Sequence, residues 1–258
     1  FKNSTFWPNN TIIYKIESGF SAGQVSAITG AINDLEGSTN LNFIAQSTET
    51  IYVSINPGTG CSAFIGMPSS GVNVLTLGQG CFSNGTIMHE LLHTAGIMHE
   101  QAREDRDTYV NINYSNIPLN KHHNFNQVIT GWSDHGPYDF SSIMHYGAYA
   151  FAIDPNIPTI TTIPTGIPIG LSDLSSGDIA TVNRMYPVCT SSTLTYNSSD
   201  IQPGRYKTSG AMYVGGDITA GTWAIMSAGT ALKLTAGASI KSGDDGKVKL
   251  VLSGCNID

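Results

Sequence analysis

Charged side chains are scarce in this sequence of 258 residues, of which Asp, Glu, Lys and Arg together make up 12%. The 12 Lys and Arg are outnumbered by 19 Asp and Glu, which gives a net charge of −7. With no surplus of positive charge to neutralise phosphates, nucleic acid is excluded as the main partner. The longest basic cluster, Lys121-His122-His123, is too short to change that conclusion. Long apolar runs are also missing, so no segment is expected to span a membrane.

Cysteine is rare as well, and no two cysteines form a CxxC pair, so a zinc site made of thiolates is not expected. An even number of cysteines in a chain rich in Ser, Thr and Asn suits two disulfides formed in an oxidising compartment. The alternative is a cytosolic protein with buried free thiols. The sequence opens with Phe1-Lys2-Asn3 and shows no signal peptide, which indicates the mature form of a secreted protein. The four cysteines are Cys61, Cys81, Cys189 and Cys255.

Apolar residues make up 40% of the chain, enough to form a packed core. Runs rich in β-branched or alternating apolar residues predict strands over 11–16, 41–44 and 51–55. Apolar positions at helical spacing predict a helix over 21–35, with Ser21 as its N-cap. Two more helices are predicted over 86–95, ended by Gly96, and over 176–186, ended by Pro187. The first part of the chain is therefore expected to contain a mixed α/β sheet layer.

The residue composition and the apolar pattern of the sequence change near residue 190. Residues 189–258 carry short alternating apolar segments among many Gly, Ser and Thr, which predicts a small all-β module. Tight turns are expected at Gly215-Gly216 and Asp245-Gly246. Stretches containing Ala-Gly recur about every eight residues, which leaves a short β-roll and stacked hairpins as alternatives. The aromatic residues of this module are interpreted as core residues, the alternative being a face that contacts a matrix or surface.

One run carries metal chemistry: His89-Glu90-Leu91-Leu92-His93-Thr94-Ala95-Gly96-Ile97-Met98-His99. On a helix, His89 and His93 lie on one face and can bind the same metal ion. Gly96 permits the sharp turn that brings His99 back as a third ligand. Three neutral imidazoles leave an open position on one Zn²⁺ per chain, where a bound water is acidified and lies within reach of Glu90. The alternative is a helix that carries ordinary surface histidines.

Residues beyond this run point to a known family. The segment 99–107 extends the zinc motif, and Tyr138-Asp139-Phe140-Ser141-Ser142-Ile143-Met144-His145-Tyr146 has the form of a Met-turn. Together with segments 6–9, 60–81 and 176–179, these motifs resemble the astacin family of metzincin zinc endopeptidases, in particular bacterial members of the myroilysin or flavastacin type. The resemblance covers residues 6–187. It implies an α+β fold in which residues 1–188 form a metzincin protease domain, with a zinc helix and a mixed twisted sheet, followed by the all-β module over 189–258.

The resemblance assigns a role to each site residue. His89, His93 and His99 are implied to bind zinc, with Glu90 as the general base that takes a proton from the zinc-bound water. Tyr146 is implied to bind zinc at rest and then to swing away and stabilise the oxyanion. The alternative for Tyr146 is an ordinary core tyrosine. Met144 is implied to form an apolar floor beneath the three histidines, and His145 is interpreted as a structural histidine.

Glu100 follows the third histidine. In the family, this acid meets the N-terminal ammonium that is freed when the propeptide is removed, a role that Phe1 could fill here. Few residues precede Trp7, so the alternative is that Glu100 pairs with Arg103 or Arg106.

The resemblance also bears on how the four cysteines pair. Cys61 and Cys81 match a disulfide of the family. Asn40 stands where the family's second disulfide has its first cysteine, so Cys189 lacks that partner and is paired with Cys255, the one cysteine left.

Ser172 stands where many members carry an arginine that favours acidic residues after the cut. We therefore expect no strong preference for Asp there, and broad cleavage favouring apolar or small residues.

The function that follows is a secreted, extracellular zinc endopeptidase acting on protein or peptide substrates. A monomer is expected, with contact to a matrix or surface through the C-terminal module as an open alternative. A second reading is a binding protein whose protease fold has lost activity. Such loss usually removes a zinc histidine or the base, and all four residues are intact.

Overall fold

A computed structural model describes residues 6–128 and 131–187 in full and, from 194 to 252, the backbone of six strands. The chain divides into two compact units. One consists of Phe1–Trp7 and Thr11–Met185, and the other of Pro8–Asn10 and Tyr186–Asp258. The N-terminal part of the second unit, Pro8–Asn10, is a short 3₁₀ turn, η1.

The first unit is built on a sheet of five strands in the order β2-β1-β3-β5-β4. Three neighbouring pairs are parallel, and the edge strand β4 runs antiparallel to β5, which confirms the predicted mixed sheet. The inward residues Ile12, Val53, Ile55 and Leu75 are fully buried, as apolar side chains of a covered sheet should be. The strands are β1 Thr11–Ile16, β2 Asn42–Ala45, β3 Tyr52–Gly58, β4 Cys61–Ala63 and β5 Val72–Gly78.

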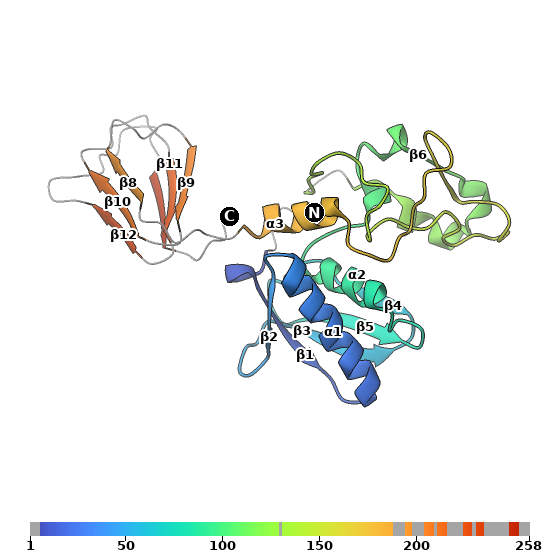
Figure 1. Ribbon diagram of the computed structural model, residues 1–258, viewed down its shortest axis with the longest axis horizontal. Coiled ribbons are helices and arrows are strands. Elements are labelled where there is room, and N and C mark those ends of the chain that lie inside the picture. The colour runs from blue at the N-terminus through green and yellow to red at the C-terminus, as the bar shows by residue number, and fades with distance from the viewer. Residues whose placement is uncertain are drawn as a thin grey trace. The chain divides into compact units, whose positions relative to one another are not determined.

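Two helices pack against this sheet and against each other (Figure 1). Helix α1, Ala22–Ser38, begins at the predicted N-cap: Ser21 Oγ accepts a hydrogen bond from Gln24 N, and the Gln24 side chain accepts one from Ser21 N. Helix α2, Asn84–Thr94, begins two residues before the predicted start because Ser83 caps it, with Ser83 Oγ accepting from Thr86 N. Gly96 follows with φ 103°, in the left-handed region that the sequence predicts.

The rest of the first unit consists of short elements around a second core. These are the 3₁₀ helices η2 Glu100–Ala102, η3 Arg106–Thr108, η4 Tyr114–Asn116 and η5 Leu119–Phe125, the antiparallel strands β6 Val110–Ile112 and β7 Ile160–Thr162, and helix α3 Ser176–Met185. Val110, Ile117, Phe125, Tyr138 and Ile160 form the buried cluster, against which Tyr146 packs. Burial of these side chains fixes the position of Tyr146 although the surrounding chain has little regular structure.

The second unit contains two three-stranded parallel sheets, ordered β12-β10-β8 and β13-β11-β9, between which the chain alternates. Such parallel pairing suits a β-roll and not stacked hairpins. The strands are β8 Leu194–Asn197, β9 Gly204–Thr208, β10 Ala211–Gly215, β11 Ala224–Ala228, β12 Ala231–Leu234 and β13 Val248–Leu252. The all-β module and the Cys189–Cys255 pairing stay predictions, because both cysteines, the module's connecting segments and its side chains lie outside the described residues.

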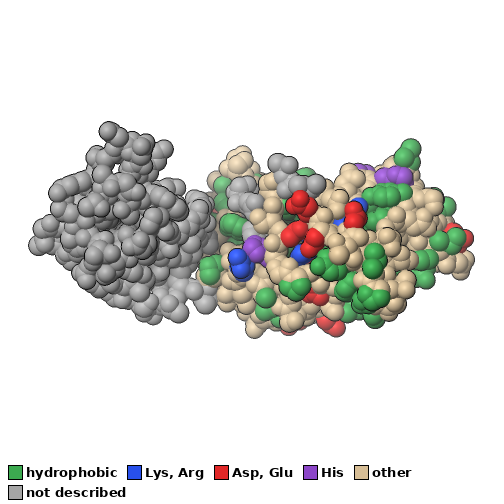
Figure 2. Space-filling model, turned by 90° about the horizontal axis from the view of Figure 1, so that it is seen from above, with side chains coloured by type: hydrophobic (Ala, Val, Ile, Leu, Met, Phe, Trp, Pro, Cys, Tyr) green, Lys and Arg blue, Asp and Glu red, His purple; other side chains and the backbone are tan. Residues whose placement is uncertain are grey.

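The surface reflects the composition. On the face of the molecule shown in Figure 2, charged side chains are few, and uncharged polar groups and backbone cover most of the described part. Among the helices of the described residues, none is both long and apolar enough to cross a bilayer.

Candidate metal centre and active site

The three histidines of the sequence motif meet at one point. Helix α2 carries His89 and His93, and the Nε2 atom of each lies 3.2 Å from Nε2 of His99. The remaining nitrogens of the two helical histidines face backbone carbonyls: His89 Nδ1 lies 2.8 Å from Ile143 O, and His93 Nδ1 lies 2.7 Å from Ile97 O. Since a carbonyl only accepts, each Nδ1 carries the proton and each Nε2 keeps its lone pair. The centre therefore presents converging nitrogen donors.

The protonation state of these imidazoles suits a metal. Burial lowers the pKa of all three, that of His93 to about 3, and the neighbouring histidines lower the pKa of His93 and His99 further. Neutral imidazole is the form that binds metal ions, so little free energy is needed to deprotonate the site. Gly96 contributes through its left-handed backbone, which ends α2 so that the chain can return with His99.

Glu90 is the second component of the site. Its side chain is 5% exposed, and burial raises the pKa of its carboxyl to about 7. No group in the described part of the chain hydrogen-bonds the buried Glu90 Oε2 atom. An unpartnered buried oxygen is costly unless a water or ligand meets it. Three neutral nitrogen donors, one orphaned carboxylate oxygen and an adjoining cleft of about 890 Å³ fit a catalytic Zn²⁺ with an open position.

Tyr146 lies beside the histidines, with its ring centroid 4.4 Å from that of His99. Its backbone N donates to Oε1 of the fully buried Gln101, at 3.0 Å. Phe125 and Phe151 pack on the ring. Burial, with a smaller contribution from Glu90, raises the pKa of the Tyr146 phenol to about 12, so this group is a hydrogen-bond donor at neutral pH. No local signal in the sequence predicts this role for Gln101, although the residue is part of the motif that carries the family resemblance.

Asp178 on helix α3 braces the Met-turn. Its carboxylate accepts hydrogen bonds from Ser142 Oγ at 2.6 Å, from Ile143 N at 2.9 Å and from Ser175 N at 3.0 Å. The carbonyl of the same residue, Ile143 O, is the acceptor for His89 Nδ1. Asp178 on α3 is thus linked to a metal ligand through one residue, Ile143. Asp178 belongs to segment 176–179, which carries part of the family resemblance, but its bracing role was not predicted because its partners in the Met-turn lie more than 30 residues away.

We expect Asp178→Ala to lower the free energy of unfolding by about 2–4 kcal/mol, because three donors lose their acceptor and at least two stay buried. A thermal melt should show Tm lowered by roughly 4–16 °C. Asp34→Ala is the control, since Asp34 is exposed and accepts one bond, from Asn84 Nδ2. Equal Tm values for the two variants would contradict the bracing role.

The remaining predicted positions are also placed. Met144 is buried, and its carbonyl accepts from Glu100 N at 3.1 Å. His145 is buried with Nε2 2.7 Å from the Tyr138 hydroxyl, as a structural histidine would be. Cys61 and Cys81 form the disulfide that the resemblance implied, and Cys61 lines the cleft.

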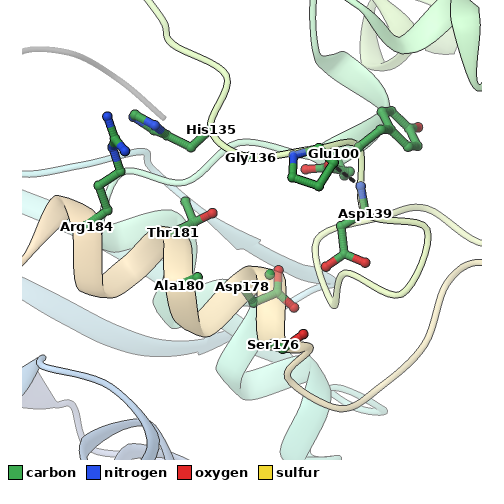
Figure 3. A pocket seen from close by; sticks show the side chains of 12 residues that line it. Glu100, His135, Gly136, Asp139, Ser176, Asp178, Ala180, Thr181 and Arg184 are labelled. Atoms are coloured by element: carbon green, nitrogen blue, oxygen red, sulfur yellow. Dashed lines mark hydrogen bonds between the residues drawn. The ribbon is translucent and has the colours of Figure 1, made fainter.

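Glu100 faces a second cavity of about 520 Å³, in which Glu100 and Asp139 lie at one end and His135 and Arg184 at the other (Figure 3). Glu100 Oε1 accepts from Asp139 N at 2.8 Å and lies 3.5 Å from Arg103 Nη1. One of the two expected arginine partners is therefore present, whereas Arg106 pairs with Asp107. Phe1 lies outside the described residues, so a link to the N-terminus stays a prediction.

Comparisons with known proteins agree on one family. The model of the peptidase family "Astacin" matches residues 1–187. High choriolytic enzyme 1 of Oryzias latipes is 39% identical over 194 residues, which cover 72% of this chain and 71% of that protein. Its solved structure, titled as a hatching enzyme zinc-protease, matches with a TM-score of 0.67 over 72% of this chain and 96% of that chain.

One further relative and one further solved structure also match. Flavastacin of Elizabethkingia meningoseptica is 33% identical over 188 residues, which cover 70% of this chain and 42% of that protein. A structure of myroilysin, at 22% identity and a TM-score of 0.52, shares the fold over 72% of this chain and 98% of that chain. The family-model match contains the three histidines, Glu90 and the Met-turn, and the resemblance inferred from these motifs is confirmed. The chain therefore belongs to the astacin family of zinc metalloendopeptidases.

Proposed function

We propose that this protein is a secreted endopeptidase that hydrolyses internal peptide bonds of extracellular proteins. The observation that carries the proposal is the convergence of three histidine Nε2 atoms beside the unpartnered carboxylate oxygen of Glu90, at an open cleft. An inactive binding protein of the same fold would have no reason to keep a buried, unpartnered carboxylate, which costs stability.

Zinc bound by the three histidines would supply Lewis acidity, lowering the pKa of a water and polarising the scissile carbonyl. Glu90 would accept the proton of the attacking water and later pass it to the leaving amide nitrogen. A carboxyl with a pKa of about 7 suits both steps, because it can hold and release a proton near neutral pH. Its burial beside the cleft keeps other donors away from Oε2.

Tyr146 would stabilise the tetrahedral oxyanion. Its phenol stays protonated well above neutral pH, and Gln101 fixes its backbone while the ring rests beside His99. A donor aimed at the developing charge stabilises the transition state more than the ground state.

Tyr146→Phe should therefore lower kcat by about 10²-fold with a much smaller change in KM, since the lost bond forms mainly in the transition state. The bound zinc should stay at one equivalent per chain, because the three histidines are untouched. Steady-state kinetics on a quenched peptide, with metal analysis of the same sample, checks this. A kcat equal to that of the wild type would assign Tyr146 to packing alone.

The test of the proposed function is digestion of denatured casein by the purified chain, with mass spectrometry of the new termini. Cuts at internal bonds would establish an endopeptidase, and stepwise loss from one end would indicate an exopeptidase. No cleavage, together with stoichiometric zinc, would favour the binding protein.

We propose that the chain acts as a monomer, which sedimentation can test. A matrix-binding role for residues 189–258 would give a truncated chain normal activity on soluble protein and reduced activity on insoluble protein. Equal activity on both would remove that role.

A further inference from the structure

The backbone that follows Tyr146 is in direct contact with a segment much later in the chain. Gly147 comes next after Tyr146, and Gly170 lies against it. A Cβ atom at Gly170 would lie 2.7 Å from Gly147 N, closer still to Gly147 Cα, and 3.4 Å from Tyr146 C. Only a residue without a side chain allows two backbones to approach in this way. Gly170 therefore contacts the Tyr146–Gly147 peptide through its bare backbone.

The backbone of Tyr146 is also held on its other sides. Its N–H donates to Gln101 Oε1 at 3.0 Å. Its carbonyl lies 2.7 Å from His145 Nδ1, which carries the proton because a carbonyl only accepts. Nε2 of the same histidine then accepts from the Tyr138 hydroxyl at 2.7 Å. With Gly170 on the remaining side, these contacts decide where the Tyr146 side chain starts.

The segment that contains Gly170 is anchored at both ends. Ile169 packs against the buried cluster of the second core. At the other end, Ser172 O lies so close to Gly85 that a Cβ atom there would collide with it. Gly85 belongs to α2, the helix that carries two of the three histidines and the general base. Segment 169–172 thus extends from the start of α2 to the peptide that follows Tyr146.

We propose that segment 169–172 is a spacer that sets the distance between α2 and Tyr146, with Gly170 as a positioning residue for Tyr146. The inference rests on the proposed function, in which the Tyr146 hydroxyl stabilises the oxyanion while Glu90 acts from α2. A donor to an oxyanion works only within hydrogen-bond distance of the developing charge. A misplacement of about 1 Å can cost about 10²-fold in rate, so a small shift of the Tyr146–Gly147 peptide is enough to slow the reaction.

The test makes the same substitution at two glycines of the same region. Gly170 and Gly166 have φ 73° and 93°, in the left-handed region that Asn tolerates better than most residues. A new Cβ meets the Tyr146–Gly147 peptide at Gly170, whereas none of the described atoms lies within 4 Å of one at Gly166. We expect Gly170→Asn to lower kcat by about tenfold, with a smaller change in KM and one equivalent of zinc retained. Gly166→Asn should keep the wild-type kcat and KM.

The decisive comparison repeats both substitutions in the Tyr146→Phe background, on the same quenched peptide. If Gly170 acts through the Tyr146 hydroxyl, Gly170→Asn should change kcat by no more than about twofold once that hydroxyl is gone. An equal loss of kcat in both backgrounds would overturn the inference, because general damage to the fold does not depend on the hydroxyl. Gly170→Ala, which adds only the Cβ atom, gives the same comparison if the Asn variant yields too little folded protein.

Two other outcomes separate this inference from the proposed function. A wild-type kcat in folded Gly170→Asn would show that the exposed segment moves aside and leaves Tyr146 in place, which overturns the spacer and keeps the endopeptidase. Failure of the zinc-loaded wild type to cut the peptide, or an unchanged kcat in Tyr146→Phe, would instead overturn the proposed function or the role of Tyr146 in it, and the spacer with them.

Discussion

Removal of the metal by a chelator is expected to reduce peptide hydrolysis to background, and one equivalent of Zn²⁺ per chain is expected to restore it. The three histidine Nε2 atoms converge and the imidazoles are neutral near pH 7, so the site can rebind zinc without first losing protons. Without the metal, Glu90 and Tyr146 would activate a water and polarise a carbonyl far less than the zinc-loaded site would.

The measurement is the rate of casein hydrolysis before chelation, after it, and after addition of zinc, with zinc content determined in each sample. Circular dichroism of the metal-free sample separates loss of chemistry from loss of fold. Full activity in a sample shown to be free of metal would contradict the zinc mechanism. Recovery with no more than one equivalent would agree with the one site found among the described residues.

Glu90→Gln should lower kcat/KM by about 10²–10⁴-fold while leaving one equivalent of zinc bound. Glutamine has the shape of glutamate, so the packing of α2 and the three histidines should persist. The amide of glutamine cannot take the proton of the attacking water. It would also place an NH₂ donor where Glu90 has the unpartnered oxygen Oε2.

Glu104→Gln provides the matched control, because Glu104 is exposed and lies in the same extended motif outside the cleft. Its activity should equal that of the wild type. If Glu90→Gln kept more than a tenth of the activity with zinc bound, the base would have to be another group. If the variant lost its zinc, the result would point to a structural role for Glu90 in the metal site.

Local signals predicted the helices well. Ser21 begins α1 as expected, and the buried stripe of Ile28, Ile32 and Leu35 follows helical spacing. The start of α2 was predicted two residues late, because Ser83 satisfies the first free N–H groups of the helix and this cap was not recognised. Strand β4 was not predicted. It has three residues and no alternation, and it exists through pairing with β5 beside the Cys61–Cys81 disulfide.

The sequence by itself determined the metal centre, because its ligands are set by short-range geometry. Two histidines four residues apart share a helix face, and a glycine that tolerates positive φ returns the chain for the third. The same motifs were enough to place the chain in its family and to name zinc as its metal.

Only the tertiary structure decided how this centre is supported and what surrounds it. Asp178 accepts from the N–H of Ile143, whose carbonyl faces His89, Gln101 accepts from the N–H of Tyr146, and Lys121 lies beside Phe151 in the cleft. All three links join residues 30 or more positions apart. Contacts of that kind arise when separate segments pack into a common core, and no local periodicity in the sequence encodes which polar side chains that packing brings together.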